Sequence, residues 1–439
     1  MIGVTRRTAL LLPFGVAGCS SLSGLLDPIK PTLTGTRIPL SAARRGLEIK
    51  PGAGGVATVP PVAPLPDWPQ AGGNATHTPG NPAVANLNPA WTADIGAGTG
   101  YRQRITAQPV IAGGRVITMD ANGTVSAFAL DRGRELWRTN TRPKKNRSTN
   151  VGGGVAASAT TVWATTGRAE VLALDAATGH IRWRKPLGSP ARSSPTLADG
   201  RLYTTTLEGK LLAFAADTGE PAWNYQASTT VTSLFAVSSP AAADGFVIAG
   251  FNSGELVAVR ADSGALAWSD SLASAQGTSS LTDLSAISAL PVIDQGRVFA
   301  IGVDGLLVSL DLRSGRRLWE RDVGGSETPW VAGESMWVLT QEQALAALDP
   351  RDGRPFWVDS LERFHNVKQQ SGSVYWVGPL LAGGKLIAAS SDGQIAAFDP
   401  ARGTLLGSRK GGNSVTISPI AASGTLILLD DEGTLAAYR

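Results

Sequence analysis

The sequence predicts an all-β fold, an eight-bladed β-propeller of four-stranded antiparallel blades. The first observation is a residue pair, Gly followed four positions later by Trp, that recurs with Trp-to-Trp steps of 46, 40, 45, 51 and 38 residues. Self-similarity at this period is typical of propellers and other repeat folds. The second is that 52 glycines accompany a charged fraction of only 17%, which suits many short strands joined by tight turns. The pairs are Gly133/Trp137, Gly179/Trp183, Gly219/Trp223, Gly264/Trp268, Gly315/Trp319 and Gly353/Trp357.

Each repeat follows one order of strands and turns. It opens with a proline and a short apolar strand, as at Pro109–Ile111, and a Gly-containing turn leads to a second apolar strand. Another tight turn with glycine, ten residues before the glycine of the Gly–Trp pair, leads to a third strand that alternates apolar and other residues. The Gly–Trp turn then starts the fourth strand, and four short strands in 40–50 residues describe one propeller blade. We expect the six tryptophans to pack between neighbouring blades.

Counting the second-turn position gives eight repeats, centred near residues 123, 169, 209, 254, 305, 343, 393 and 433. Ala169 and Gln343 stand where the other six have glycine, so we expect those two hairpins to be degraded. The eighth repeat reaches Arg439 without a fourth strand, and the seventh has Gly407 in place of its tryptophan. An isolated strand with Trp91, at 87–95, is expected to complete the last blade and close the ring. The propeller is therefore predicted over residues 67–439.

The N-terminus carries the features of an export signal. Arg6 and Arg7 precede an apolar run that is too short to span a bilayer, and the run ends in Val-Ala-Gly before Cys19, the single cysteine. This ending resembles the lipobox of bacterial lipoproteins, which implies a signal peptide over 1–18, lipidation of Cys19 and, with Ser20 next, sorting to the outer membrane. Export through the general or the twin-arginine route is left open. Residues 19–66 hold eight prolines and no apolar periodicity, which predicts a disordered tether between the lipid anchor and the ring.

The motif A-x-D-x-x-T-G-x-x-x-W at 173–183 resembles the blade repeat of pyrroloquinoline-quinone (PQQ) dehydrogenases. Together with the lipobox, the eight repeats and the stretch 281–319, the chain resembles the BamB family, the propeller lipoproteins of the outer-membrane β-barrel assembly machinery. The resemblance implies a non-enzymatic scaffold on the periplasmic face of the outer membrane. Such a scaffold binds the periplasmic domains of a BamA-like insertase and helps barrel proteins, themselves possible partners, to fold and insert.

The same resemblance points to two inter-blade connections, 224–239 and 269–290, as the insertase contact. Leu234 and Leu284 match the apolar part of the family's contact, whereas Phe235 stands for an arginine, and Ala286 and Ser288 stand for two acids. The partner-binding residues expected here are therefore Leu234, Phe235 and Leu284. The alternative is that these three side chains lie inside ordinary loops.

The sequence offers no pattern for catalysis, for a cofactor or for a metal. Its three histidines, His77, His180 and His365, are far apart, and no phosphate-binding loop, G-x-S-x-G or H-E-x-x-H motif is present. A net charge of +4 over so large a chain is not the footprint of a nucleic-acid-binding protein. Two alternatives remain to the scaffold, a PQQ-dependent dehydrogenase with a calcium-binding set of carboxylates, and a propeller that binds another envelope protein or polymer.

Overall fold

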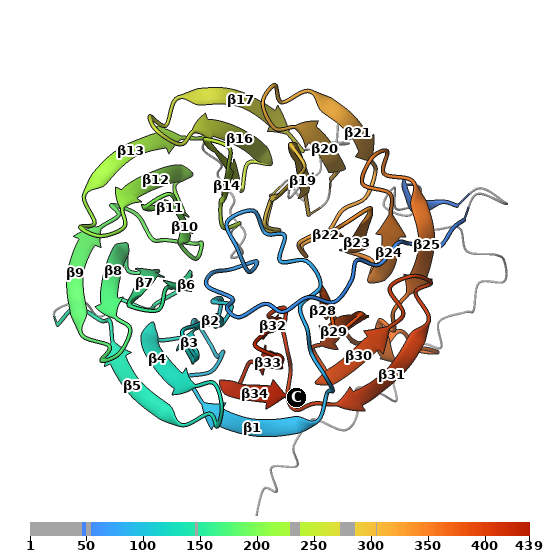
Figure 1. Ribbon diagram of the computed structural model, residues 1–439, viewed down its shortest axis with the longest axis horizontal. Coiled ribbons are helices and arrows are strands. Elements are labelled where there is room, and N and C mark those ends of the chain that lie inside the picture. Colours follow the sequence, from blue (N-terminus) through green and yellow to red (C-terminus); the bar gives the residue numbers. More distant parts are fainter. Residues whose placement is uncertain (1–45, 50–53, 145–147, 229–237, 273–285, 304) are drawn as a thin grey trace, which may run out of the picture. The chain divides into compact units, whose positions relative to one another are not determined.

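The computed structural model describes residues 46–49, 54–144, 148–228, 238–272, 286–303 and 305–439. Eight four-stranded antiparallel sheets are arranged around a central axis as the blades of a propeller (Figure 1). The predicted all-β fold class and the number of blades are confirmed. Among the described residues, no helix is long and apolar enough to cross a membrane.

The blades follow one another along the chain, and in blades 1 to 7 the strands of each sheet lie in sequence order from the axis outward. Blades 1 to 4 are β2 (Val110–Ala112), β3 (Arg115–Met119), β4 (Thr124–Ala129), β5 (Glu135–Asn140); β6 (Gly153–Ala157), β7 (Thr161–Thr166), β8 (Glu170–Asp175), β9 (Ile181–Pro186); β10 (Thr196–Ala198), β11 (Arg201–Thr205), β12 (Lys210–Ala215), β13 (Pro221–Gln226); and β14 (Ala241–Ala243), β15 (Phe246–Gly250), β16 (Glu255–Arg260), β17 (Leu266–Ser271).

The other blades have the same plan, with one added hairpin. Blades 5 to 7 are β18 (Val292–Asp294), β19 (Arg297–Ile301), β20 (Leu307–Asp311), β21 (Arg317–Arg321); β22 (Trp330–Ala332), β23 (Ser335–Leu339), β24 (Ala344–Leu348), β25 (Pro355–Ser360); and β28 (Trp376–Ala382), β29 (Lys385–Ser390), β30 (Gln394–Phe398), β31 (Leu405–Lys410). The hairpin of β26 (Phe364–Asn366) and β27 (Ser371–Ser373) lies in the connection between blades 6 and 7. Blade 8 combines β32 (Ile420–Ala422), β33 (Thr425–Leu429) and β34 (Thr434–Tyr438) with β1 (Pro89–Asp94).

The two ends of the propeller sequence close the ring, as predicted. Strand β1 pairs antiparallel with β34, from Pro89 opposite Tyr438 to Asp94 opposite Thr434. The main chains of Asn88 and Arg439 extend this pairing by exchanging two hydrogen bonds, of 3.2 and 2.9 Å. Blade 8 is therefore completed by a strand from the other end of the propeller, and the ring has no open blade.

The repeated tryptophans join neighbouring blades, which confirms their predicted packing. The Trp137 indole of blade 1 donates a 2.9 Å hydrogen bond to the carbonyl oxygen of Ala176 in blade 2. Its ring also lies against Gly179, where an added Cβ would come within 2.4 Å of Trp137 Cε3. Gly179 has a φ of 72°, so the turn needs glycine for its conformation and for space. Trp91, Trp183, Trp223, Trp268, Trp319 and Trp357 make the same indole bond to the next blade.

The absence of a tryptophan from blade 7 follows from this arrangement. Gly407 of β31 pairs with Ala397 of β30, and Trp137 of β5 pairs with Ala127 of β4 in the same way. Position 407 is therefore equivalent to the position of the tryptophan in blade 1. The next blade, blade 8, has no turn between its third and fourth strands, because β34 and β1 come from opposite ends of the ring sequence. An indole at position 407 would therefore have no glycine turn to cover.

The two hairpins that lack glycine are regular, and the prediction that they are degraded is wrong. Ala169 has a φ of 62° and Gln343 a φ of 61°, the left-handed conformation that glycine adopts elsewhere in the ring. Their amides close the turns on Thr166 and Thr340 with bonds of 3.2 and 2.9 Å. The surrounding sheet stabilises these two turns strongly enough to hold a non-glycine residue in an unfavourable conformation.

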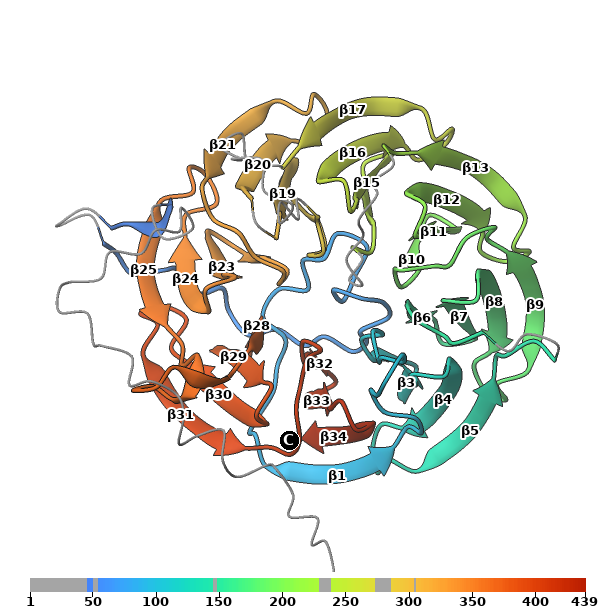
Figure 2. The ribbon, with the colours of Figure 1, turned by 180° about the vertical axis from the view of Figure 1, so that it is seen from behind.

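Residues 65–84, the axial segment, cross the centre of the ring (Figures 1 and 2). The segment contacts the innermost strand, or the turn after it, in every blade. Main-chain bonds join Trp68 to Ile111, Pro69 to Ala157, Ala75 to Ala242, Thr76 to Ile293, Pro82 to Gly383 and Leu65 to Ser423. The Gln70 side chain accepts from Leu197 in blade 3, and the Trp330 indole of blade 6 donates to Gly80. Composition gave no sign of this element.

The disordered, Pro-rich tether predicted over 19–66 does not include its last residues, 54–66, which contact the ring. Gly55 donates a main-chain hydrogen bond to Phe356 of β25, and Ala57, which is 2% exposed, donates to Ala401. Pro60 accepts a bond from the Asn81 side chain, and Ala63 bridges Pro82. These contacts make residues 54–66 part of the folded unit. Extended proline-rich backbone forms no hydrogen bonds within itself, so its carbonyl and amide groups are available to a neighbouring surface.

Candidate functional site: connection face and central cavity

The predicted partner-binding residues Leu234, Phe235 and Leu284 lie outside the described residues, as does Cys19. The structure does show where the two connections that carry the partner-binding residues start and end. The first joins β13 of blade 3 to β14 of blade 4, and the second joins β17 of blade 4 to β18 of blade 5. Both return toward the axis at the start of an innermost strand, so the described ends of the two connections lie on neighbouring blades.

The returning ends of the two connections are bonded to each other. Ser238, which is fully buried, donates a 2.7 Å hydrogen bond to the carbonyl oxygen of Ala289. Ile287 donates its amide to Phe251, and Ala286 accepts from Val303. The two connections are therefore anchored as one unit on blades 4 and 5.

The positions where the family carries acids are interior positions in this chain. Ala286 is 2% exposed, and the Ser288 hydroxyl is buried without a hydrogen-bond partner. A carboxylate at either position would need a buried counter-charge or several donors. Ala286 and Ser288 are small and uncharged, so neither position requires a buried counter-charge.

A cavity of about 200 Å³ lies on the axis of the ring, next to this anchored unit. Trp68, Ala71, Gly72 and His77 of the axial segment form part of its wall. The axial segment binds the far ends of the innermost strands, whereas the residues just before those strands line the rest of the cavity. The axial segment is therefore the floor of the cavity, and the described ends of the two connections, at Ser239 and Ser288, lie in its wall.

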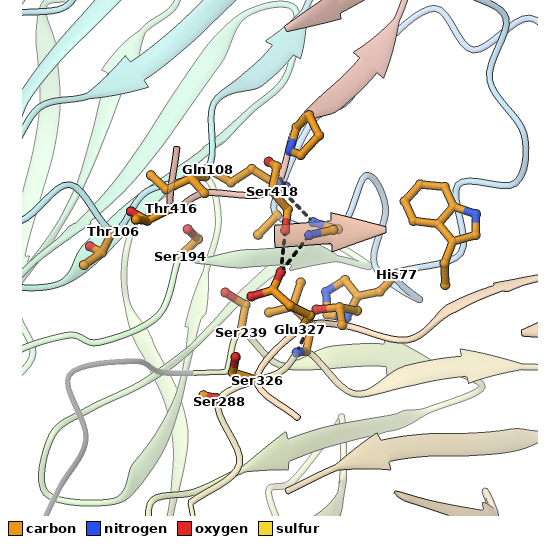
Figure 3. Close-up of a pocket in the computed structure, with 18 of the residues that line it drawn as sticks. His77, Thr106, Gln108, Ser194, Ser239, Ser288, Ser326, Glu327, Thr416 and Ser418 are labelled. Carbon is orange, nitrogen blue, oxygen red and sulfur yellow. Dashed lines mark hydrogen bonds between the residues drawn. The ribbon is translucent and has the colours of Figure 1, made fainter. Parts of the chain in front are cut away.

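Seven blades contribute the same structural position to the cavity wall, the residue just before the proline that opens the blade. These residues are Gln108, Ser194, Ser239, Leu290, Thr328, Gly378 and Ser418. Extended backbone is favoured before proline, so equivalent side chains of the other six blades point alike, whereas Gly378 has a φ of 121° and contributes only its backbone. The wall is consequently rich in hydroxyl groups, and Figure 3 shows several of them around Glu327.

Glu327 is the one carboxylate among the lining residues. Its Oε2 atom accepts hydrogen bonds from the Gly378 amide (3.0 Å) and the Ser418 hydroxyl (2.8 Å), so it links blade 6 to blades 7 and 8 (Figure 3). Burial raises the pKa of this carboxyl, while the two donors act in the opposite direction. Oε1 accepts no hydrogen bond from the described residues.

His77 is buried in the floor of the cavity, with 3% of its surface exposed. Its Nδ1 lies 2.6 Å from the carbonyl oxygen of Pro291, and a carbonyl can only accept, so Nδ1 carries the proton. Burial lowers the pKa of His77 from 6.5 to about 4, so at neutral pH the ring is uncharged and Nε2 is an acceptor. Nε2 has no hydrogen-bond partner within the part of the chain that the structure describes.

The comparisons with known proteins identify the family. The family model described as outer membrane protein assembly factor BamB matches residues 121–359. The chain belongs to the BamB family. The BamB proteins of Yersinia pestis and Escherichia coli are each 28% identical to it, over 70% of this chain and 76% of theirs. That of Burkholderia pseudomallei is 27% identical over 72% of this chain and 89% of its own.

Solved structures agree on the fold. BamB from Moraxella catarrhalis superimposes with a TM-score of 0.66 at 18% identity, covering 78% of this chain and 99% of that one. The quinohemoprotein alcohol dehydrogenase from Comamonas testosteroni has the same TM-score at 14% identity, covering 86% of this chain and 81% of its own. The dehydrogenase is a distant relative in fold, and the curated relatives cited above are assembly factors.

The cavity does not fit the calcium and PQQ that the dehydrogenase alternative requires. Among the residues that the structure describes, its lining holds one carboxylate and no aspartate. Within the described parts of the chain, no three His, Cys, Asp or Glu side chains are grouped as metal ligands would be. The fold agrees with membership of the BamB family, and the residues of the central cavity do not assign calcium or PQQ to it.

The sequence alone does not predict this cavity. A signal was present, since Ser-Pro or another X-Pro pair opens seven of the eight blades. Each proline predicts where a strand starts, but it does not predict that the residues before the prolines face one shared cavity. No local motif marks Glu327 or His77 as a cavity residue. The two residues line one cavity because blade 6 and the axial segment both lie at the axis of the ring.

Proposed function

We propose that this chain is a lipid-anchored BamB-type scaffold on the periplasmic face of the outer membrane, and that it has no enzymatic activity of its own. It binds the periplasmic domains of a BamA-like insertase and helps β-barrel proteins to reach and enter the membrane. Membership of the BamB family carries this proposal. The lipobox at Cys19 supports the anchor.

The contact proposed is the connection face of blades 3 to 5, with Leu234, Phe235 and Leu284 as its apolar residues. The convergence of the two connections on adjacent blades supports this choice, since a protein interface needs its apolar anchors close together. The hydrogen bond from Ser238 to Ala289 supports it further, because it fixes the bases of the connections relative to each other. No charged pair from Ala286 or Ser288 takes part, because neither side chain is ionisable, Ala286 is buried and the Ser288 hydroxyl is buried.

The experiment is affinity purification of the full chain from outer membranes in mild detergent. The tag is inserted in the exposed turn 367–370 between β26 and β27, on the connection between blades 6 and 7 and away from the proposed contact. Co-purification of a barrel insertase in near-equal amount is expected, and recovery of the propeller alone contradicts the proposal. Cys19→Ala is expected to move the protein out of the membrane fraction, and its retention there would remove the lipid anchor.

A further inference from the structure

The central cavity has chemistry that the scaffold role does not use. A lining that served only to pack the ring would have its polar groups bonded to each other, because an unpaired buried polar atom costs about 1–3 kcal/mol. Here His77 Nε2 and the Ser288 hydroxyl oxygen are buried without a hydrogen-bond partner among the described residues, and Glu327 Oε1 likewise accepts no hydrogen bond from them. All three residues line the same space.

These three groups are complementary to a donor. His77 Nε2 accepts only, because its neutral ring has its proton on Nδ1, and a carboxylate also accepts only. The Ser288 hydroxyl can accept as well. Trp68 and Trp330, whose ring centres lie 6.2 Å apart, add two indoles to the wall, and indole faces attract cations. Arg192 of blade 3 is the other charged group of the lining, and its Nη1 donates to the carbonyl oxygen of Val151.

We infer that the central cavity binds a primary ammonium group, held by the Glu327 carboxylate and His77 Nε2, with the hydroxyls of the wall receiving a further polar group of the same ligand. An ammonium has three N–H donors and no acceptor, which matches the unbonded atoms. A volume of about 200 Å³ admits a compact amine. This inference does not depend on the proposed scaffold function.

Two sources carry this group, a free small amine and the lysine side chain of a protein docked on the connection face. Ser239, which ends the first connection, and Ser288, which lies near the end of the second, line the cavity, so a lysine of a partner docked on the connections would enter beside them. Ethanolamine is the probe for the first source and Nα-acetyl-lysine amide for the second. Binding of one probe alone assigns the source.

The test is calorimetric titration of the full chain in detergent with these two amines, with glycerol as a neutral probe and acetate as an anionic one. At least one amine is expected to bind, at least tenfold more tightly than glycerol or acetate. Its affinity is expected to rise with pH as Glu327 ionises, while His77 stays neutral and Arg192 stays charged. Equal binding of glycerol, or no binding of either amine, overturns the inference, and this comparison needs no variant.

Glu327→Gln keeps the size of the side chain and removes its charge, so it is expected to weaken amine binding at least tenfold. The matched control is Glu334→Gln, in the exposed turn between β22 and β23, which is expected to bind as the wild type does. If Glu327→Gln does not fold, Glu327→Asp retains the charge at a shorter reach and is expected to bind more weakly. Unchanged affinity in a folded Glu327 variant contradicts the role of this carboxylate.

Discussion

At the scale of single residues, the ring depends on the contact of each repeated tryptophan with the glycine turn of the next blade. The indole is at once an apolar filler and a hydrogen-bond donor, as Trp137 shows with its bond to Ala176. Only a residue without Cβ leaves room for the ring face. The Gly–Trp pair in the sequence therefore belongs to two interfaces, because each Trp contacts the glycine of the following blade and not its own.

Trp137→Ala is expected to reduce the free energy of unfolding by about 3–5 kcal/mol, the usual range for truncating a buried tryptophan. Gly179→Ala should also destabilise, because its Cβ would lie 2.4 Å from Trp137 Cε3. In the double variant the clash is absent, so the combined loss should be smaller than the sum. Denaturant unfolding measures all three.

The control for these variants is Leu406→Ala on the exposed outer strand β31, where Leu406 is 56% exposed. A change of about 0.5 kcal/mol or less is expected there. A strictly additive double variant would show that Trp137 and Gly179 do not interact energetically.

His77 makes stability depend on pH. Its folded pKa of about 4 lies below the unfolded value of 6.5, so the unfolded state binds more protons between these two values, and stability falls as pH falls through that window. At about 1.4 kcal/mol for each pH unit, the full loss is about 3 kcal/mol. His77→Asn should lose this part of the pH dependence.

The measurement is the difference in unfolding free energy between wild type and His77→Asn at pH 7.5 and at pH 4.5. Glu327 acts in the opposite sense, because its raised pKa makes the folded state lose stability as pH rises through that pKa. This contribution is present in both proteins and cancels in the difference. A difference that does not change with pH would contradict the assigned protonation of His77.

At the scale of elements, the axial segment is the part that no repeat contains. Residues 65–84 bond to the innermost strand or following turn of every blade, while having almost no regular secondary structure of their own. They supply partners to amides on the inner edge of the ring, such as those of Ala157, Ala242 and Ile293. An inner edge without such partners would leave those amides unsatisfied or open to water.

Replacing residues 69–80 with a Gly/Ser linker of equal length is expected to lower the unfolding midpoint and to speed hydrogen exchange at Ala157, Ala242 and Ile293. These amides would lose their acceptors, whereas amides of the middle strands would keep theirs. A Gly/Ser replacement of the exposed turn 367–370 is the control and should leave both measurements unchanged. Unaltered exchange at the three inner amides would mean that the axial segment does not protect them.

At the scale of the whole molecule, ring closure sets which surfaces are available to a partner. Strand β1 completes blade 8, so the ends of the ring sequence are held in one sheet. The described ends of the connections on blades 3 to 5, at Ser239 and Ser288, line the central cavity. The proposed insertase contact therefore starts next to the cavity.

Leu234→Asp combined with Leu284→Asp is expected to abolish co-purification of the insertase while leaving the unfolding midpoint unchanged, because charge at the centre of an apolar contact is costly. The matched control is Leu405→Asp and Leu406→Asp on β31 of blade 7, where both leucines are 56% exposed. Normal co-purification by the first double variant would place the contact elsewhere on the ring.

The sequence by itself determined the blade, the number of blades and the closing strand. The blade and the number of blades depend on contacts within about 50 residues that repeat with one period, such as that of Trp137 with Gly179. The closing strand follows from the fourth strand that the eighth repeat lacks. Only the tertiary structure decided the regular turns at Ala169 and Gln343, the axial segment and the cavity with Glu327 and His77. The physical reason is that the axial segment and the cavity form between residues far apart in the chain, His77 with Pro291 for example. The two turns hold a left-handed non-glycine residue because the surrounding sheet stabilises them. A local pattern does not record a contact that exists only when eight blades meet on one axis.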